Sequence, residues 1–420
     1  MDSAPSLAVT GRRRRLPRPR GGLIVGALAF HLLISVSAAQ SAESIGDPIR
    51  GQSLFAAKEC VRCHAVRGAG GRIGPDLGRQ AVKGSFFEIA AGLWNHSLNM
   101  DQKMQEFRVP RPTFRDDELA DLVAFLYFLN YFDEPGDSQT GRMLFTQKHC
   151  IECHRVEGIG GRVGPDLSSQ ARGLSPLRIA QDLWNHGPQM VGSMKAKGLD
   201  VPKFEGNQII DLIAYLRSRG ERRGAREFQS AGDPEIGRKL FGSKGCARCH
   251  AIFGNGEEIG PDLGSGELRG SVTQLSGRMW NHWPDMAEAM ETLEMRLPTF
   301  KGDELADIFA YIFISRYAGQ PGSPQRGRTV YRQKGCSACH GLAGEGSISA
   351  PALRNLVAAE TREQILQRMW NHAPRMRVQM GNRQIGWPYL EAAEVADLLA
   401  FLARGLSDGA AAAQAVTPSR

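Results

Sequence analysis

The sequence predicts an all-α protein of four tandem domains, and three observations lead to this prediction. The chain of 420 residues contains four C-x-x-C pairs, whose first cysteines, Cys60, Cys150, Cys246 and Cys336, lie 90, 96 and 90 residues apart. Such a fixed period indicates a repeated unit. Each unit ends in a segment whose apolar residues recur at i, i+3, i+4 and i+7, which is the period of a helix. No segment alternates apolar and polar residues as a half-buried strand does.

The repeat also predicts the domain boundaries. We expect domain 1 at 46–133, domain 2 at 134–220, domain 3 at 232–319 and domain 4 at 320–406. The basic, polar stretch 221–231 is predicted to be a linker, and the Ala-rich residues 407–420 a loose tail. Domains 1 and 3 open with Gly-Asp-Pro, whereas domains 2 and 4 open with Pro-Gly, so the second half of the chain repeats the first.

Two helices frame each predicted unit. The early helix carries a glycine nine residues before the first cysteine and an aromatic residue four positions after that glycine: Gly51 and Phe55, Gly141 and Phe145, Gly237 and Phe241, Gly327 and Tyr331. A glycine at this point allows another helix to approach closely. The last helix carries the apolar stripe: Leu119, Leu122, Val123 and Leu126; Ile209, Leu212, Ile213 and Leu216; Leu305, Ile308, Phe309 and Ile312; Val395, Leu398, Leu399 and Leu402.

The N-terminus has the layout of an export signal. Six arginines between Arg12 and Arg20 precede the short apolar stretch 22–36, and small residues follow at Ser37, Ala38 and Ala39. This order is typical of a secretory signal, which we assign to residues 1–39. Because the apolar stretch is shorter than the ~20 residues of a spanning helix, we favour cleavage after Ala38 or Ala39 and keep an uncut membrane anchor as the alternative. Both interpretations predict a periplasmic or extracytoplasmic protein.

The formal charge of the chain, +8, does not indicate a nucleic-acid partner. Residues 1–39 contribute +5 of this charge, so the remainder carries +3. A mixed surface with so small an excess of positive charge is ordinary for a globular protein. We therefore expect no nucleic acid among the partners.

Each cysteine pair, completed by Cys63, Cys153, Cys249 or Cys339, is followed at once by a histidine: His64, His154, His250 and His340. C-x-x-C-H is the attachment motif of c-type haem. Two thiols on one helical turn can add to the two vinyl groups of a porphyrin, and the adjacent histidine then binds the iron. A Cys₄ zinc site would leave these histidines unexplained, and a thioredoxin-like redox pair needs a βαβ setting. Structural disulfides would not demand a histidine after every pair. We therefore predict four covalent c-type haems.

A proline lies eleven residues after each of these histidines, at Pro75, Pro165, Pro261 and Pro351. With the glycine-aromatic helix, the C-x-x-C-H motif and an Ala-Phe or Ala-Tyr in the last helix, the chain resembles the class I c-type cytochromes over nearly its whole length after the signal. The resemblance implies that the proline carbonyl accepts a hydrogen bond from the ligand histidine, and a simple turn proline is the plainer interpretation. Unit 4 departs from the Gly-Pro-Asp-Leu of the others, with Ala350 and Ala352 around its proline.

The sixth iron ligand remains open at this level. Each unit contains Trp-Asn-His followed by two methionines, with the spacing H-x₃-M-x₃-M: His96, Met100 and Met104; His186, Met190 and Met194; His282, Met286 and Met290; His372, Met376 and Met380. Haem c takes His/Met or His/His ligation. The resemblance places a methionine shortly before the last helix, where this chain has Arg111, Val201, Leu297 and Trp387, none of which can serve. We predict the second methionine (Met104, Met194, Met290, Met380), ahead of the first methionine and the histidine.

The tryptophans that open this motif, Trp94, Trp184, Trp280 and Trp370, have two interpretations. As large apolar side chains with one N–H, they could line the haem and bond a propionate. Packing in the protein core is the alternative.

Together these features favour a tetrahaem carrier of single electrons, with no catalytic residue, that serves redox partner proteins or a membrane respiratory complex. Haem-attachment machinery is an expected partner during maturation, and an uncut signal would add membrane association. The alternatives are a multihaem oxidoreductase with one open haem, unit 4 being the candidate, that acts on a small inorganic substrate, and a haem subunit of a membrane respiratory complex. Aromatic extensions of the last helices of domains 1 and 3 lead us to expect that each odd domain packs on the next even domain, giving two dihaem halves: Tyr127, Phe128, Tyr131 and Phe132; Tyr311, Phe313 and Tyr317.

Overall fold

The computed structural model describes residues 45–78, 84–129, 133–169, 174–220, 232–264, 270–348, 350–353 and 360–402. The predicted signal (1–39), linker (221–231) and tail (407–420) lie outside these ranges. The described ranges contain no helix that is both long enough and apolar enough to cross a membrane. Their regular secondary structure is almost entirely helical, with only short two-residue strands, so the all-α prediction is confirmed.

The four domains repeat one order of elements. Domain 1 contains α1 (Pro48–Ala57), η1 (Cys60–Arg62), β1 (Ala65–Val66), β2 (Ala69–Gly70), α2 (Phe86–Glu106) and α3 (Glu118–Phe128). Domain 2 contains α4 (Ser138–Gln147), η2 (Cys150–Glu152), β3 (Arg155–Val156), β4 (Ile159–Gly160), α5 (Pro176–Ala196) and α6 (Gln208–Arg219). Each strand pair is a two-residue antiparallel hairpin that follows the ligand histidine.

Domain 3 contains α7 (Pro234–Ser243), η4 (Cys246–Arg248), α8 (Val272–Asn281), α9 (Trp283–Thr292) and α10 (Glu304–Ala318). Domain 4 contains α11 (Pro324–Gln333), α12 (Ser337–His340), α14 (Arg362–Asn382) and helical residues 392–402. Pro284 lies at the start of α9, and the long helix of domain 3 divides at His282. Prolines at the matching positions, Pro188 and Pro374, lie inside the unbroken helices α5 and α14.

Within each domain the early helix crosses the last helix at the glycine that recurs in the early helix of every unit. A Cβ added to Gly51 would lie 2.0 Å from the backbone oxygen of Asp121, and one added to Gly237 would lie 1.9 Å from that of Asp307. The equivalent distances in domains 2 and 4 are 2.0 and 1.9 Å, to Asp211 and Asp397. The side chain of the same aspartate accepts a hydrogen bond from the backbone N–H that begins the early helix, as Asp121 does from Asp47 at 2.7 Å. The prediction of a close approach at the glycine is confirmed.

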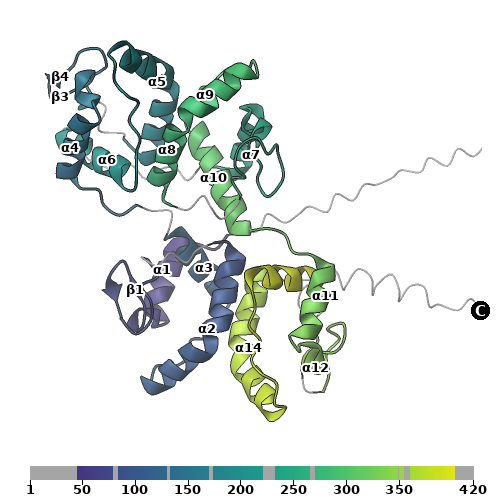
Figure 1. The fold of residues 1–420 in the computed structure, drawn as a ribbon. Coiled ribbons are helices and arrows are strands. Elements are labelled where there is room, and N and C mark those ends of the chain that lie inside the picture. The colour runs from purple at the N-terminus through teal and green to yellow at the C-terminus, as the bar shows by residue number, and fades with distance from the viewer. Residues whose placement is uncertain are drawn as a thin grey trace, which may run out of the picture. The chain divides into compact units, whose positions relative to one another are not determined.

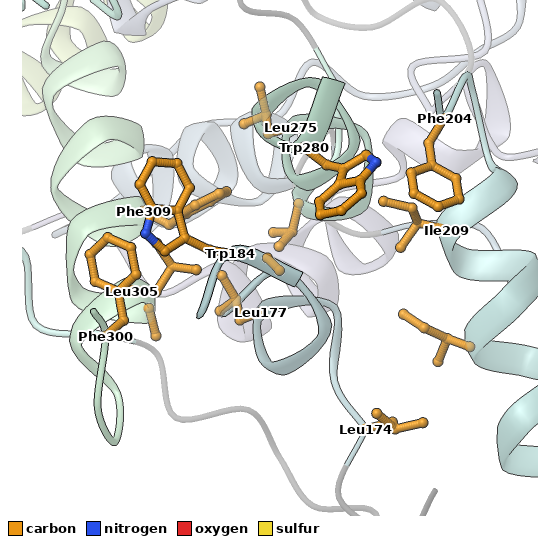
Figure 2. Close-up of a cluster of buried hydrophobic side chains, with 14 of the residues drawn as sticks. Leu174, Leu177, Trp184, Phe204, Ile209, Leu275, Trp280, Phe300, Leu305 and Phe309 are labelled. Carbon is orange, nitrogen blue, oxygen red and sulfur yellow. The ribbon is translucent and has the colours of Figure 1, made fainter. Parts of the chain in front are cut away.

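The buried apolar residues form two cores, and each core is shared by two domains. One joins domains 2 and 3, where α5 packs on α8. The other joins domains 1 and 4, where α2 packs on α14, and it also contains Tyr317 from the end of α10 in domain 3. Figure 1 shows α2 and α14 side by side although more than 250 residues separate them. Figure 2 shows the first core, in which the indole of Trp184 lies beside Phe300 and that of Trp280 beside Phe204.

The expected partnership of each odd domain with the next even domain is therefore wrong. The pairs are 1 with 4 and 2 with 3, and we call them pair 1–4 and pair 2–3. The aromatic extensions of domains 1 and 3 contact each other instead: the Tyr127 hydroxyl donates to the Phe313 carbonyl at 2.7 Å, and the Tyr127 and Tyr317 rings lie 5.0 Å apart. Tyr131 and Phe132 lie outside the described residues.

Candidate haem sites

Each cysteine pair lies on one tight turn that follows a residue in the left-handed conformation, such as Glu59 with φ 63°. Within the turn the backbone N–H of the histidine donates to the backbone carbonyl of the first cysteine, at 2.9 Å from His64 to Cys60. The same bond occurs in the other three domains at 2.8 to 3.0 Å. All eight cysteines are free thiols of intermediate exposure, so three groups that a porphyrin needs are presented by one turn.

The first cysteine of each pair faces apolar surroundings. Burial raises the pKa of Cys60, Cys150, Cys246 and Cys336 to about 11. A thiol with a pKa raised in this way is neutral at physiological pH. Within the described ranges no group of three or more His, Cys, Asp or Glu side chains could hold a metal ion directly.

The predicted hydrogen bond between histidine and proline is present in all four domains. Nδ1 of His64, His154, His250 and His340 lies 3.0, 3.2, 2.9 and 3.0 Å from the carbonyl oxygen of Pro75, Pro165, Pro261 and Pro351, respectively. A partner on Nδ1 fixes the orientation of an imidazole and leaves Nε2 for a metal. Each ring is thus held as an iron ligand would be.

The glycine before this proline makes room for the imidazole. A Cβ added to Gly74, Gly164 or Gly260 would lie 2.4, 2.4 or 2.5 Å from Cε1 of the histidine. Domain 4 has Ala350 at this position, and its histidine lies on the α-helical turn α12 and is only 8% exposed. The divergence of unit 4 in sequence therefore corresponds to a different turn around His340.

Two further residues of the repeat organise the haem-side loop, and the sequence analysis did not assign them a role. The aspartate of Gly-Pro-Asp-Leu accepts backbone N–H bonds across the loop: Asp76 from Arg67, Gly68 and Gly78, at 2.7 to 2.9 Å. The lysine two residues before the first cysteine donates from Nζ to a carbonyl 55 residues later, as Lys58 does to Thr113 at 2.9 Å. The lysine occupies the same position in all four units and the aspartate in the first three, and that periodicity was the available signal.

A cavity of about 1260 Å³ in domain 4 has the residues that a haem requires. Cys336, Cys339, His340 and Pro351 line it, and so do His372, Met376 and Met380. Most of the remaining wall is apolar, including Ile365, Leu398 and Leu402. The volume exceeds the ~300–1,000 Å³ of common ligand pockets, and the donor set is that of haem c, so the residues fit a covalently held porphyrin.

The candidate sixth ligands lie along one helix in domains 1, 2 and 4, and on α9 with its preceding residue in domain 3. The first methionines, Met100, Met190, Met286 and Met376, pack against the apolar cores. The second methionines are half-buried outside those cores. The histidines are exposed in domains 1 to 3. His372 of domain 4 is half-buried, and burial, followed by the charge of His340, lowers its pKa.

The four tryptophans join the paired domains, and we call this contact the Trp-Asn clamp. Each indole N–H donates to the carbonyl of the proline before the partner's last helix, at 2.7 to 2.8 Å: Trp94 to Pro388, Trp370 to Pro112, Trp184 to Pro298 and Trp280 to Pro202. The side chain of the adjacent asparagine makes two more hydrogen bonds with the paired domain. Asn185, for example, accepts from the backbone N–H of Phe300 at 2.9 Å and donates to its carbonyl at 2.8 Å.

The clamp excludes one part of the first interpretation of the tryptophans, which is the bond to a propionate. Because the indole N–H already has a carbonyl partner, it is not the donor for a propionate. Trp94 nevertheless lines the cavity of domain 4, so this side chain of domain 1 forms part of its partner's haem site. Packing between domains and lining a haem site are therefore combined in one residue.

Replacing Asn185 by alanine is expected to lower the free energy of unfolding by ~2–4 kcal/mol. The substitution leaves the N–H and the carbonyl of Phe300, a residue only 5% exposed, without their partner, and unsatisfied buried groups carry the full cost of desolvation. Denaturant unfolding followed by circular dichroism measures the change. Asn99→Ala, at an exposed position of α2, is the control and should change stability little; an equal loss in both variants would contradict the role of the clamp.

Comparison with known proteins agrees with this geometry. The cytochrome c family matches residues 49–129, 138–220, 234–313 and 324–405. Neither the curated proteins nor the solved structures gave a match to the chain. The four matches cover most of the chain and coincide with the four turns that present two cysteines and a histidine. The chain therefore belongs to the cytochrome c family, as a protein of four cytochrome c domains with four covalent haems.

Proposed function

We propose that this protein is a periplasmic electron carrier that passes single electrons between redox partners, or to a membrane respiratory complex, through four His/Met-ligated haems. The observation that carries the proposal is the fourfold turn in which Nδ1 of the histidine bonds the proline carbonyl and Nε2 remains for the iron. Haem supplies one-electron chemistry, and the protein supplies orientation, ligands and surroundings. Filled axial positions on all four irons suit transfer better than catalysis.

For the sixth ligand we propose the second methionine of each unit, Met104, Met194, Met290 and Met380. The first methionines are engaged with the apolar cores. Nδ1 of His96 and His186 bonds a carbonyl of the same helix, of Gly92 and Asp182, at 2.9 Å, and both rings are exposed. Methionine ligation raises the reduction potential relative to bis-histidine ligation, which suits a carrier in an oxidising compartment.

Absorption spectra of the purified holoprotein test both points. Ferric His/Met haem shows a weak band in the far red, and we expect Met290→Ala to remove one of its four contributions while Met286→Ala retains all four. The reduced native protein should not bind carbon monoxide, because no axial position is open. Carbon monoxide binding at one haem would instead favour the oxidoreductase, and loss of the band in Met286→Ala alone would move the ligand to the first methionine.

The extracytoplasmic location rests on the N-terminal signal pattern and on the covalent haems, since attachment machinery must load them. N-terminal sequencing of the exported protein distinguishes the two forms of that signal. A chain that begins near Gln40 indicates a cleaved signal and a diffusible carrier. An intact N-terminus indicates an anchored protein.

A further inference from the structure

The clamp brings a side chain of one domain into the haem site of the other. Trp94, on α2 of domain 1, is 4% exposed and lines the cavity of domain 4 beside Cys336 and His340. The same helix carries the candidate sixth ligands of haem 1, as we call the haem of domain 1, and likewise haems 2 to 4: His96, Met100 and Met104. One helix therefore supplies a wall of haem site 4 and the candidate ligands of haem 1.

Pair 2–3 is joined in the same way. Trp184 of domain 2 donates to the carbonyl of Pro298, and Trp280 of domain 3 donates to that of Pro202, both at 2.7 Å. Pro388, the proline at this position in domain 4, lines the haem cavity of that domain. Equivalent contacts therefore connect the two haem sites within each pair.

The contact between the two pairs is made chiefly by domains 1 and 3. Besides its hydrogen bond to the Phe313 carbonyl, Tyr127 packs its ring against that of Tyr317, which also lies 6.2 Å from the ring of Phe86. All four residues are buried, and they come from α2 and α3 of domain 1 and α10 of domain 3. We call this set of four residues the aromatic junction.

A second, polar contact joins the same two domains. The carboxylate of Asp133, at the end of domain 1, accepts hydrogen bonds from the hydroxyls of Ser271 and Thr273 at the start of α8. Both hydroxyl residues are buried. Arg67, three residues after the ligand histidine His64, donates to the Asp133 carbonyl at 3.2 Å. The haem-side loop of domain 1 is therefore bonded, through one residue, to the helix of domain 3 that carries its clamp tryptophan.

The aromatic junction directly follows the apolar stripes of the last helices. In domain 4 three residues of this stripe, Leu398, Leu399 and Leu402, line the haem cavity. The residues at the position of Leu402 in domains 1 and 3, Leu126 and Ile312, come immediately before Tyr127 and Phe313. By the register of the repeat, the junction therefore joins the helices that form haem-site walls in these two domains.

Domains 2 and 4 take a smaller part in joining the pairs. For the residues that the structure describes, the hydrogen bonds, ion pairs and ring contacts of domain 2 stay within pair 2–3. Domain 4 reaches domain 3 with Arg362, the first residue of α14, which donates to the Ala318 carbonyl at 2.8 Å and lies over the ring of Tyr317. The main contacts therefore run in the order domain 2, domain 3, domain 1, domain 4.

We propose that electrons pass between the haems in this contact order, 2–3–1–4, and not in the order of the chain, so that redox partner proteins dock at domains 2 and 4. This inference rests on the proposed carrier function. A reduced partner protein gives one electron to the ferric iron at one end. Each step then oxidises one ferrous haem and reduces its ferric neighbour, and an oxidised partner protein takes the electron from the other end. Because electron tunnelling becomes much slower with distance, domains in direct contact set the order.

Removing one haem at a time tests the order. Four variants of the full chain each replace both cysteines of one pair by alanine, and spectroelectrochemical titration gives the three remaining midpoint potentials. A reduced haem places an extra electron beside its neighbours, so its loss shifts the potentials of those neighbours most. We expect two shifted potentials when haem 1 or haem 3 is removed, and one when haem 2 or haem 4 is removed. Transfer in chain order requires the opposite result for haems 1 and 2.

The two variants of each pair are matched controls for one another. Loss of haem 1 and loss of haem 4 both remove apolar bulk from pair 1–4, so a mere loss of stability would give the same count of shifted potentials in both. One shifted potential without haem 1, together with two without haem 2, would overturn the proposal.

A kinetic experiment keeps all four haems in place. Arg142→Cys, at an exposed position of domain 2, tethers the holoprotein to a gold electrode, and Tyr127→Phe retains the ring in the aromatic junction but removes its hydrogen bond. After a potential step, Tyr127→Phe should slow the arrival of the last two electrons severalfold and leave the first two unchanged. Tyr389→Phe, an exposed tyrosine of domain 4, should change neither phase. Unchanged rates in Tyr127→Phe would contradict passage from haem 3 to haem 1 at the junction.

Failure of the carrier function looks different from failure of this order. Without a carrier function, the native protein itself would lack four reversible one-electron components. Four normal components in the native protein, with the counts of shifted potentials that chain order requires, would overturn the 2–3–1–4 order alone.

Discussion

Replacing Cys150 and Cys153 together by alanine is expected to give a chain with three covalent haems instead of four. Both thioether bonds of domain 2 are lost, and His154, held by Pro165, cannot retain a porphyrin covalently. Mass spectrometry of the denatured protein should show a mass lower by one haem, and the haem content per chain should fall by a quarter. The other three domains keep their own cysteine pairs, so their haems remain.

The same variant should lose stability in pair 2–3 more than in pair 1–4. The porphyrin supplies apolar bulk to a domain whose core is shared with α8 of domain 3, whereas pair 1–4 has a separate core. Thermal unfolding followed by circular dichroism should show part of the helical signal lost at a lower temperature. Glu152→Ala, an exposed residue between the two cysteines, should keep four haems. Four acid-acetone-resistant haems in the double variant would contradict haem attachment at this pair.

Gly237→Ala is expected to destabilise domain 3 by ~3 kcal/mol, the upper end of the cost of overpacking. The new methyl group would lie 1.9 Å from the backbone oxygen of Asp307 and 2.9 Å from Cβ of Tyr311, so α7 and α10 must separate. Backbone atoms inside a helix cannot turn aside as a flexible side chain can. Denaturant unfolding followed by circular dichroism measures the loss.

Gly242 provides a matched control on the same helix. A Cβ there would meet no atom within 4 Å, and alanine favours a helix over glycine by ~0.5–1 kcal/mol. Gly242→Ala should therefore leave stability unchanged or slightly raised. Similar losses in both variants would show that the close approach of α7 to α10 is not what the first glycine provides.

The features that the sequence predicted correctly are those that one repeat contains in full. The glycine of the early helix, the C-x-x-C-H turn and the proline eleven residues later act within one domain, and their fixed spacing made each visible four times. The clamp was not predicted because its donor and acceptor lie far apart: Trp94 and Pro388 are 294 residues apart. From the sequence the tryptophan could therefore be assigned only to the wall of a haem site, with its N–H on a propionate, or to packing in the protein core.

The identity of the pairs was beyond prediction for a different reason. Every domain carries both the Trp-Asn donor and the proline acceptor, so the clamp by itself allows any two domains to pair. The features that distinguish the pairs are single residues that break the repeat. Gly187 leaves space for Trp283, because a Cβ there would lie 2.8 Å from the indole, and Asp101 pairs with Arg377. In the sequence such differences resemble neutral variation between repeats, because their effect depends on contacts between domains that the sequence does not show.

The partnership of the first domain with the last has a consequence for the order of assembly. Synthesis runs from the N-terminus, and domains generally fold as they emerge. Pair 2–3 can close as soon as the third domain exists, but the part of α2 that packs on α14 has no partner until the fourth domain has been made. Pair 2–3 therefore forms before pair 1–4. A product truncated before α14 would leave the side chains of Trp94 and its neighbours exposed to solvent, and such a product would tend to aggregate.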